Sequence, residues 1–177
     1  MRKAAVVSLL TLGCMLSACS SSSSSPATTG AAVTTTSAAA VTTTTASGPT
    51  PFYEVKLGKV PGLGEVLVAG NGFTLYMFVP DKQSGTSTCY GPCAQAWPPL
   101  DLPTGVTKPV AGAGVNASLL TTTKRTDGTT ELVYNGWPLY LWAGDSTPGQ
   151  ATGQAINNNG GLWYVLNAAG RVITTKP

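Results

Sequence analysis

The residues best suited to chemistry form two similar sets, each with a tyrosine, a second aromatic residue and an aspartate. The second set begins 64 positions after the first, and the members are Tyr76, Phe78 and Asp81, then Tyr140, Trp142 and Asp145. Each aspartate is predicted to lie in a polar turn, where a carboxylate accepts backbone amide hydrogens. A tyrosine hydroxyl of the same or the other set is an equally structural partner. In the functional alternative the two sets line a groove, where rings stack on a sugar or the carboxylates hold a cation.

Two cysteines in the middle of the chain, Cys89 and Cys93, are predicted to form a disulfide outside the cytoplasm. The bridge would close a small loop before Trp97 and stabilise the fold by about 2 kcal/mol. The segment Cys-Tyr-Gly-Pro-Cys is one residue longer than the Cys-Gly-Pro-Cys of thioredoxins, and no alternating strand and helix pattern surrounds it. A thiol oxidoreductase is therefore kept only as an alternative.

The composition argues against several other reaction classes. The chain has no histidine, which removes Ser-His-Asp and Cys-His catalysis and histidine-bound zinc. Its seven acidic residues are scattered, so no metal site, cofactor or catalytic residue is predicted. We expect Glu54, Glu65 and Glu131 at strand ends, as charges in solvent. Sequence does not exclude a carboxylate pair at glycosidase spacing, so an acid-pair glycan hydrolase is the second enzyme alternative.

The first residues predict an export signal followed by a lipid anchor. Two basic residues precede an apolar run too short to span a bilayer, so residues 1–18 are predicted to be a signal peptide. The run ends in Leu16-Ser17-Ala18-Cys19, which looks like the lipobox of bacterial lipoproteins. Cys19 is therefore the predicted lipidation site, with membrane lipid as its partner on the extracytoplasmic face of a bacterial membrane. The rest of the chain has eight basic and seven acidic residues, which argues against nucleic-acid binding.

A flexible tether is predicted after the anchor, and a folded domain after the tether. Residues 20–50 include 18 Ser or Thr among 31 residues and carry no charge. This composition cannot bury enough apolar surface to fold, so residues 19–51 are interpreted as the lipidated cysteine and a disordered tether. Every aromatic residue lies at or after Phe52, which places the folded domain at residues 52–177.

Short β-branched and aromatic runs, separated by Gly, Pro and Asn, predict an all-β domain. Asn71-Gly72 and Asn135-Gly136 suit tight hairpin turns, and a third hairpin is expected at residues 167–170. One short helical turn is expected near residues 92–97, ended by two prolines. Both faces of the motif strands are apolar, so we expect hairpin units in a small sandwich or barrel-like domain. The predicted strands are 53–57, 64–69, 73–79, 119–123, 130–134, 138–143, 162–166 and 172–174.

The two motif sets lie in stretches that align with each other, each after a hairpin turn. They read Leu-Tyr-Met-Phe-Val-Pro-Asp from Leu75 and Leu-Tyr-Leu-Trp-Ala-Gly-Asp from Leu139. This match predicts a duplicated β-unit with repeats at about residues 64–100 and 128–166, each burying its aromatic face against the other. Together with Cys-Tyr-Gly-Pro-Cys-Ala and Tyr-Asn-Gly-Trp-Pro-Leu-Tyr, the stretches resemble a family of bacterial secreted-repeat lipoproteins with the motif Tyr-x-(Phe/Trp/Tyr)-x-x-Asp.

The resemblance implies an envelope lipoprotein with a repeated β-domain, and it implies no particular reaction. We therefore expect a lipid-anchored, non-enzymatic protein whose domain binds a ligand or has a structural role. An envelope enzyme is the alternative. The further partner is expected to be a cell-wall glycan or another envelope protein.

Overall fold

The computed structural model describes residues 49–177 of the chain. The predicted signal peptide, the lipidation site Cys19 and most of the predicted tether lie outside the described residues. Within these residues, no helix has the length and apolar character needed to cross a membrane.

The described residues form ten β-strands in three small sheets, which confirms the all-β prediction. In the first sheet β1 (Glu54–Val60) pairs with β2 (Gly64–Ala69) as an antiparallel hairpin. The short strand β4 (Val110–Ala111) runs parallel to β1 on its other edge. The sequence did not predict β4, because two residues are too few to produce an alternating pattern.

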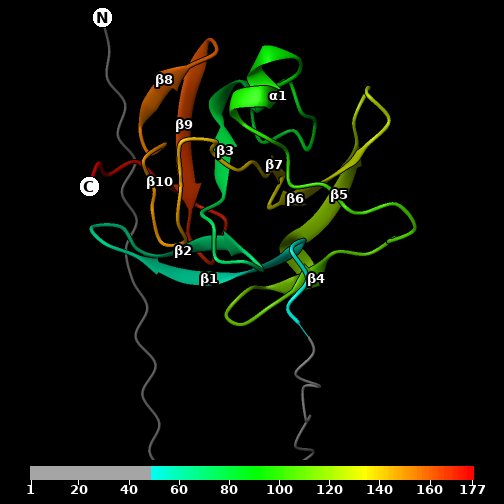
Figure 1. Cartoon of the computed structure of the whole chain (residues 1–177), viewed down its shortest axis with the longest axis horizontal. Coiled ribbons are helices and arrows are strands. Elements are labelled where there is room, and N and C mark those ends of the chain that lie inside the picture. Colours follow the sequence, from blue (N-terminus) through cyan, green and yellow to red (C-terminus); the bar gives the residue numbers. More distant parts are fainter. Residues whose placement is uncertain (1–48) are drawn as a thin grey trace, which may run out of the picture. The chain divides into compact units, whose positions relative to one another are not determined.

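The other two sheets each have one central strand. In one, β9 (Gly161–Leu166) pairs with β3 (Tyr76–Phe78), β8 (Ile156–Asn158) and β10 (Val172–Ile173). In the other, β6 (Thr130–Tyr134) lies between β5 (Leu120–Lys124) and β7 (Trp137–Pro138). Figure 1 shows β3, in green, beside β9, in orange, although the residues that pair are 85 to 89 positions apart in the chain.

The turns follow local residue chemistry. Both Asn135 and Gly136 have positive φ angles, at 49° and 81°, as the predicted hairpin between β6 and β7 requires. The helix α1 (Pro92–Ala96) begins at a proline, as expected, and two 3₁₀ turns span Val79–Asp81 and Ala117–Leu119. The strand predicted over residues 73–79 is shorter at both ends. At its start Thr74 makes only an isolated bridge to Val68, and at its end a 3₁₀ turn begins at Val79, with Pro80 in its first turn.

Each repeat pairs with the last segment of the other. The motif strand β3 of the first repeat pairs with β9 of the second. Conversely, Tyr140 of the second repeat forms a β-bridge with Pro99 of the first, and the Leu100 N–H donates to the Leu139 carbonyl at 2.8 Å. At the centre Tyr76 and Tyr140 exchange both backbone hydrogen bonds, at 2.8 and 2.9 Å. Each repeat is therefore completed by the other.

A stack of four aromatic rings runs through one of the two hydrophobic clusters. The rings of Trp97 and Trp163 are parallel, with centroids 3.8 Å apart, and both residues are fully buried. Phe78 stacks on the outer side of Trp163 at 4.1 Å, and Trp142 lies against Trp97 at 4.2 Å. Each motif aromatic therefore packs on a tryptophan of the opposite repeat, which fixes the positions of the tyrosine and aspartate beside it.

Candidate functional site

The tyrosines and aspartates of the two motif sets join across the repeats. The Tyr76 hydroxyl donates to Asp145 Oδ2 at 2.7 Å, and the Tyr140 hydroxyl donates to Asp81 Oδ2 at 2.8 Å. We call these two reciprocal pairs the clasp. The sequence left open whether each aspartate bonds the tyrosine of its own set or of the other set, and in the structure it bonds the tyrosine of the other set.

A threonine occupies the second oxygen of each aspartate. Asp81 Oδ1 accepts the backbone N–H of Thr88 at 2.8 Å and its hydroxyl at 2.6 Å. Thr152 makes the same two bonds to Asp145 Oδ1, also at 2.8 and 2.6 Å. Each carboxylate thus accepts three hydrogen bonds from the chain itself.

The clasp is shielded from solvent. Tyr76 and Tyr140 are fully buried, and Asp81 and Asp145 are 1% and 7% exposed. Burial raises the pKa of both tyrosines far above the ordinary value, so each hydroxyl keeps its proton and donates. Burial also raises the pKa of Asp81, against the opposing effect of the Thr88 and Tyr140 hydrogen bonds. These groups are satisfied internally, and of the four only Asp145 borders an opening in the described part of the chain.

A buried charged cluster extends the clasp on the Asp81 side. Because the Tyr140 hydrogen is used on Asp81, the Ser87 hydroxyl donates to the Tyr140 oxygen, at 2.6 Å. Ser87 in turn accepts from Arg125, whose Nη1 also donates to Glu131 Oε2 at 2.8 Å. The hydrogen bonds therefore form one chain, in which Arg125 donates to Ser87, Ser87 to Tyr140, and Tyr140 to Asp81.

The expectation that Glu131 is a solvated charge at a strand end is wrong. Its side chain is fully buried, and within residues 49–177 its Oε1 has no hydrogen-bond partner. Burial raises the pKa of Glu131 from 4.5 to about 8, although the Arg125 guanidinium acts in the opposite direction. The sequence pattern placed this residue at the polar end of a strand. In the fold, the segment around Asp101 pairs with β6 at Glu131, and Arg125 contacts the Glu131 carboxyl group.

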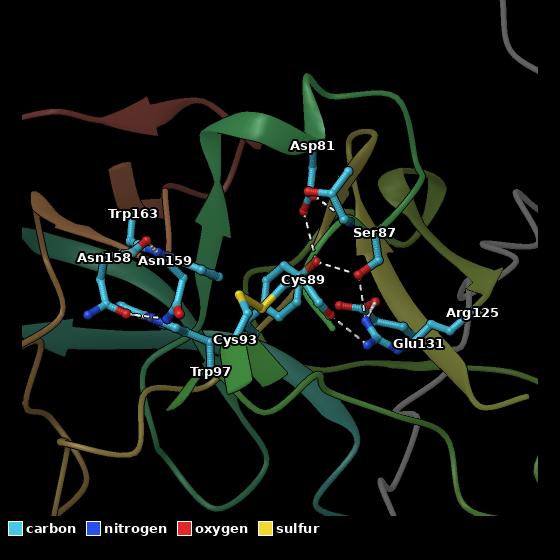
Figure 2. Close-up of a disulfide and its surroundings, with 12 residues drawn as sticks. Asp81, Ser87, Cys89, Cys93, Trp97, Arg125, Glu131, Asn158, Asn159 and Trp163 are labelled. Carbon is cyan, nitrogen blue, oxygen red and sulfur yellow. Dashed lines mark hydrogen bonds and ion pairs between the residues drawn. A yellow bond between two sulfur atoms is a disulfide. The ribbon is translucent and has the colours of Figure 1, made fainter. Parts of the chain in front are cut away.

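The predicted disulfide between Cys89 and Cys93 is present, with Cα atoms 5.2 Å apart. Figure 2 shows it between the charged cluster on one side and Trp97 on the other. The Cys89 carbonyl accepts from Arg125 Nη2 at 2.7 Å, and α1, which contains Cys93, leads directly into Trp97. The bridge therefore connects the Arg125 cluster to the aromatic stack.

The Asp145 side has neutral groups in the corresponding positions. The Tyr76 hydroxyl accepts the backbone N–H of Gly153 at 3.3 Å, where the other half has Ser87. A Cβ at Gly153 would lie 2.7 Å from the Trp97 ring, so only glycine fits there. Gln154, which is buried, donates to the Ile173 and Thr175 carbonyls and accepts from the Val165 N–H. Asn158 accepts from the Trp97 indole at 3.0 Å, on the side opposite the disulfide (Figure 2).

Two openings lie near these residues. A cleft of about 720 Å³ is bordered by Asp101, the following loop and the β5–β6 hairpin. A smaller hollow of about 220 Å³ lies at Phe52, Phe73 and Trp142, and Asp145 borders it. Of the motif residues, only Trp142 and Asp145 line the hollow, and both Asp145 oxygens are already hydrogen-bonded. No group of three or more metal-ligating side chains occurs among the described residues.

Several residues of this region were not singled out from the sequence. Thr88 and Thr152 could have been found from the sequence, because they are separated by the same 64 positions as the two motif sets. Ser87 carries no such signal, since it occurs in one repeat only and joins the cluster through long-range contacts to Tyr140 and Arg125.

A model for a family of secreted repeats of unknown function matches the chain twice, at residues 59–101 and 121–167. The first match contains Tyr76 and Asp81, and the second contains Tyr140 and Asp145. No curated protein and no solved structure matches the chain. The family description places such proteins outside the cytoplasm. The two matches cover half of the chain, so this protein belongs to the family of secreted repeats of unknown function.

Proposed function

We propose that this protein is a lipid-anchored envelope protein whose β-domain binds cell-wall glycan and catalyses no reaction. The observation that carries the proposal is the saturation of the clasp. General acid-base catalysis needs a carboxyl group that reaches the substrate, whereas Asp81 and Asp145 are buried and accept three hydrogen bonds each. The motif thus holds the two repeats together and leaves the domain surface to bind.

The other acid and thiol groups support binding over catalysis. The cleft of about 720 Å³ is lined by one carboxylate, that of Asp101, whereas a glycosidase uses two that flank the bond. Cys89, fully buried, and Cys93, half-buried, are joined in a disulfide, so neither offers a free thiolate nucleophile.

The anchor is tested by replacing Cys19 with alanine in the full chain. We expect the variant to lose acyl labelling and to leave the membrane fraction. Continued palmitate labelling and membrane partition of the variant would contradict the anchor.

Glycan binding is tested by incubating the full chain with isolated cell-wall sacculi. We expect retention on the sacculi without release of reducing ends. A chain that stays in solution contradicts binding, and new reducing ends contradict the non-enzymatic role. Each outcome therefore bears on one half of the proposal.

A further inference from the structure

The cleft of about 720 Å³ lies between two elements of different character. One wall is the loop of residues 102–107, which follows Asp101. The other is the hairpin of β5 and β6, which contributes Thr122, Lys124 and Thr130. Ligand pockets in proteins typically enclose about 300–1,000 Å³, so the cleft has the volume of a binding site.

The lining combines hydroxyl groups with small apolar surfaces. Five threonines border the cleft, together with Leu102, Pro103 and Val106, and the threonines are Thr104, Thr107, Thr122, Thr129 and Thr130. Hydroxyl groups both donate and accept hydrogen bonds, and the apolar residues offer flat C–H contacts. A sugar ring has the same two kinds of surface.

The one carboxylate of the lining belongs to Asp101, which is held rigidly. Asp101 forms a β-bridge with Glu131, and the flanking N–H groups of Leu102 and Leu132 donate to the Thr130 and Leu100 carbonyls, both at 2.8 Å. Within residues 49–177, Asp101 Oδ1 is buried and has no hydrogen-bond partner. Oδ1 is closed to solvent, so a ligand hydroxyl in the cleft would bond the other carboxylate oxygen, Oδ2.

The remaining charges limit the class of ligand. Lys124, exposed at the cleft, donates to the Gly128 carbonyl at 3.0 Å. With one carboxylate and one ammonium group, the cleft suits neither a highly charged anion nor a divalent cation, which prefers several oxygen ligands including carboxylates. The hollow at Phe52 is smaller, at about 220 Å³, and its only carboxylate is that of Asp145.

We propose that the cleft between the 102–107 loop and the β5–β6 hairpin is the oligosaccharide-binding site, with Asp101 as the acceptor for a sugar hydroxyl. This inference rests on the proposed function and names the site at which glycan binds. None of the motif residues of the clasp lines this cleft.

The test is calorimetric titration of the full chain with the tetramer of N-acetylglucosamine. We expect Asp101→Asn and Thr122→Val to lower the affinity at least tenfold while the melting temperature stays within a few degrees. Glu65→Gln, at an exposed position of β2, is the matched control for loss of a negative charge. Phe52→Ala reports on the hollow, since this side chain is 44% exposed. Both controls should bind like the parent chain.

The outcomes separate the site from the function. If the parent chain binds the tetramer and Phe52→Ala loses affinity while Asp101→Asn does not, the site is wrong and glycan binding stands. If the chain is retained on sacculi but does not bind the tetramer, the cleft does not bind this sugar backbone, and the assignment of the site is also wrong. If the chain binds neither, both the inference and the proposed function fail.

Discussion

The two halves of the clasp use the same residue types but rest on different neighbours. In both, a tyrosine hydroxyl and a threonine saturate an aspartate, with bond lengths that agree within 0.1 Å. Around Asp81 the support is ionic and covalent, from Arg125, Glu131 and the disulfide. Around Asp145 it is neutral, from Gly153 and Gln154.

The comparison shows which features the two halves share and which differ between them. The cross-repeat contact is kept in both halves because each repeat pairs with the last segment of the other. The surroundings only have to satisfy the buried groups, and charged or neutral partners can do so. Four measurements test this interpretation.

The largest effect is expected from removing Arg125. Arg125→Met leaves Ser87, Glu131 and the Cys89 carbonyl without their buried donor, so we expect a loss of about 3–5 kcal/mol in unfolding free energy. Chemical denaturation measures this loss of unfolding free energy.

Two further variants serve as controls. On the neutral side, Gln154→Met should lower the unfolding free energy by about 1–3 kcal/mol. On the charged side, Arg125→Met combined with Glu131→Leu should recover part of the loss caused by Arg125→Met alone. Equal losses in the two single variants would contradict the contrast between the halves.

The second effect is a pH dependence that belongs to the charged half. Because burial raises the pKa of Glu131 from 4.5 to about 8, the folded state binds a proton that the unfolded state loses above pH 4.5. The stabilisation is complete below pH 4.5 and is lost as the pH rises to about 8. Relative to Glu131→Gln, we expect the parent domain to lose on the order of a few kcal/mol across this range. The check is denaturation of both proteins at several pH values; parallel curves would contradict the raised pKa.

The third effect comes from the disulfide, which has no counterpart in the second repeat. Replacing Cys89 and Cys93 together by serine should lower the unfolding free energy by about 2 kcal/mol, because the small loop is no longer closed. Asn158→Ala, which removes the acceptor of the Trp97 indole, should cost about 1 kcal/mol. Mass spectrometry without reductant gives the control, since the parent chain should be two hydrogens lighter than its dithiol form.

The smallest effect is the sharpest test of the clasp. Asp81→Asn and Asp145→Asn should each cost about 1–2 kcal/mol, since an amide replaces a carboxylate that accepts three hydrogen bonds. In a double-mutant cycle, Tyr76→Phe should couple to Asp145→Asn by about 1 kcal/mol and to Asp81→Asn by nearly zero. Coupling within one repeat instead of across repeats would show that the reciprocal pairing is wrong.

The sequence alone predicted the local features of the domain. Turn residues such as Asn135-Gly136 predicted a hairpin, because positive φ angles are a property of the residues themselves. Two strands, β2 and β6, have the predicted bounds. The proline-led helix α1 and the disulfide also depend on near neighbours in the chain, and both are present.

Only the tertiary structure decided which distant groups meet. The repeat pattern marked Tyr76 and Asp145 as equivalents of Tyr140 and Asp81, but it left open whether each tyrosine bonds within its own copy. That choice depends on the pairing of each repeat with the last segment of the other, which no local pattern encodes. Glu131 is the clearest case, because its place at the end of a strand suggested solvent. In the fold it is buried, paired through its backbone with Asp101, 30 residues earlier, and through its side chain with Arg125, so the environment of a charge is a property of the whole fold.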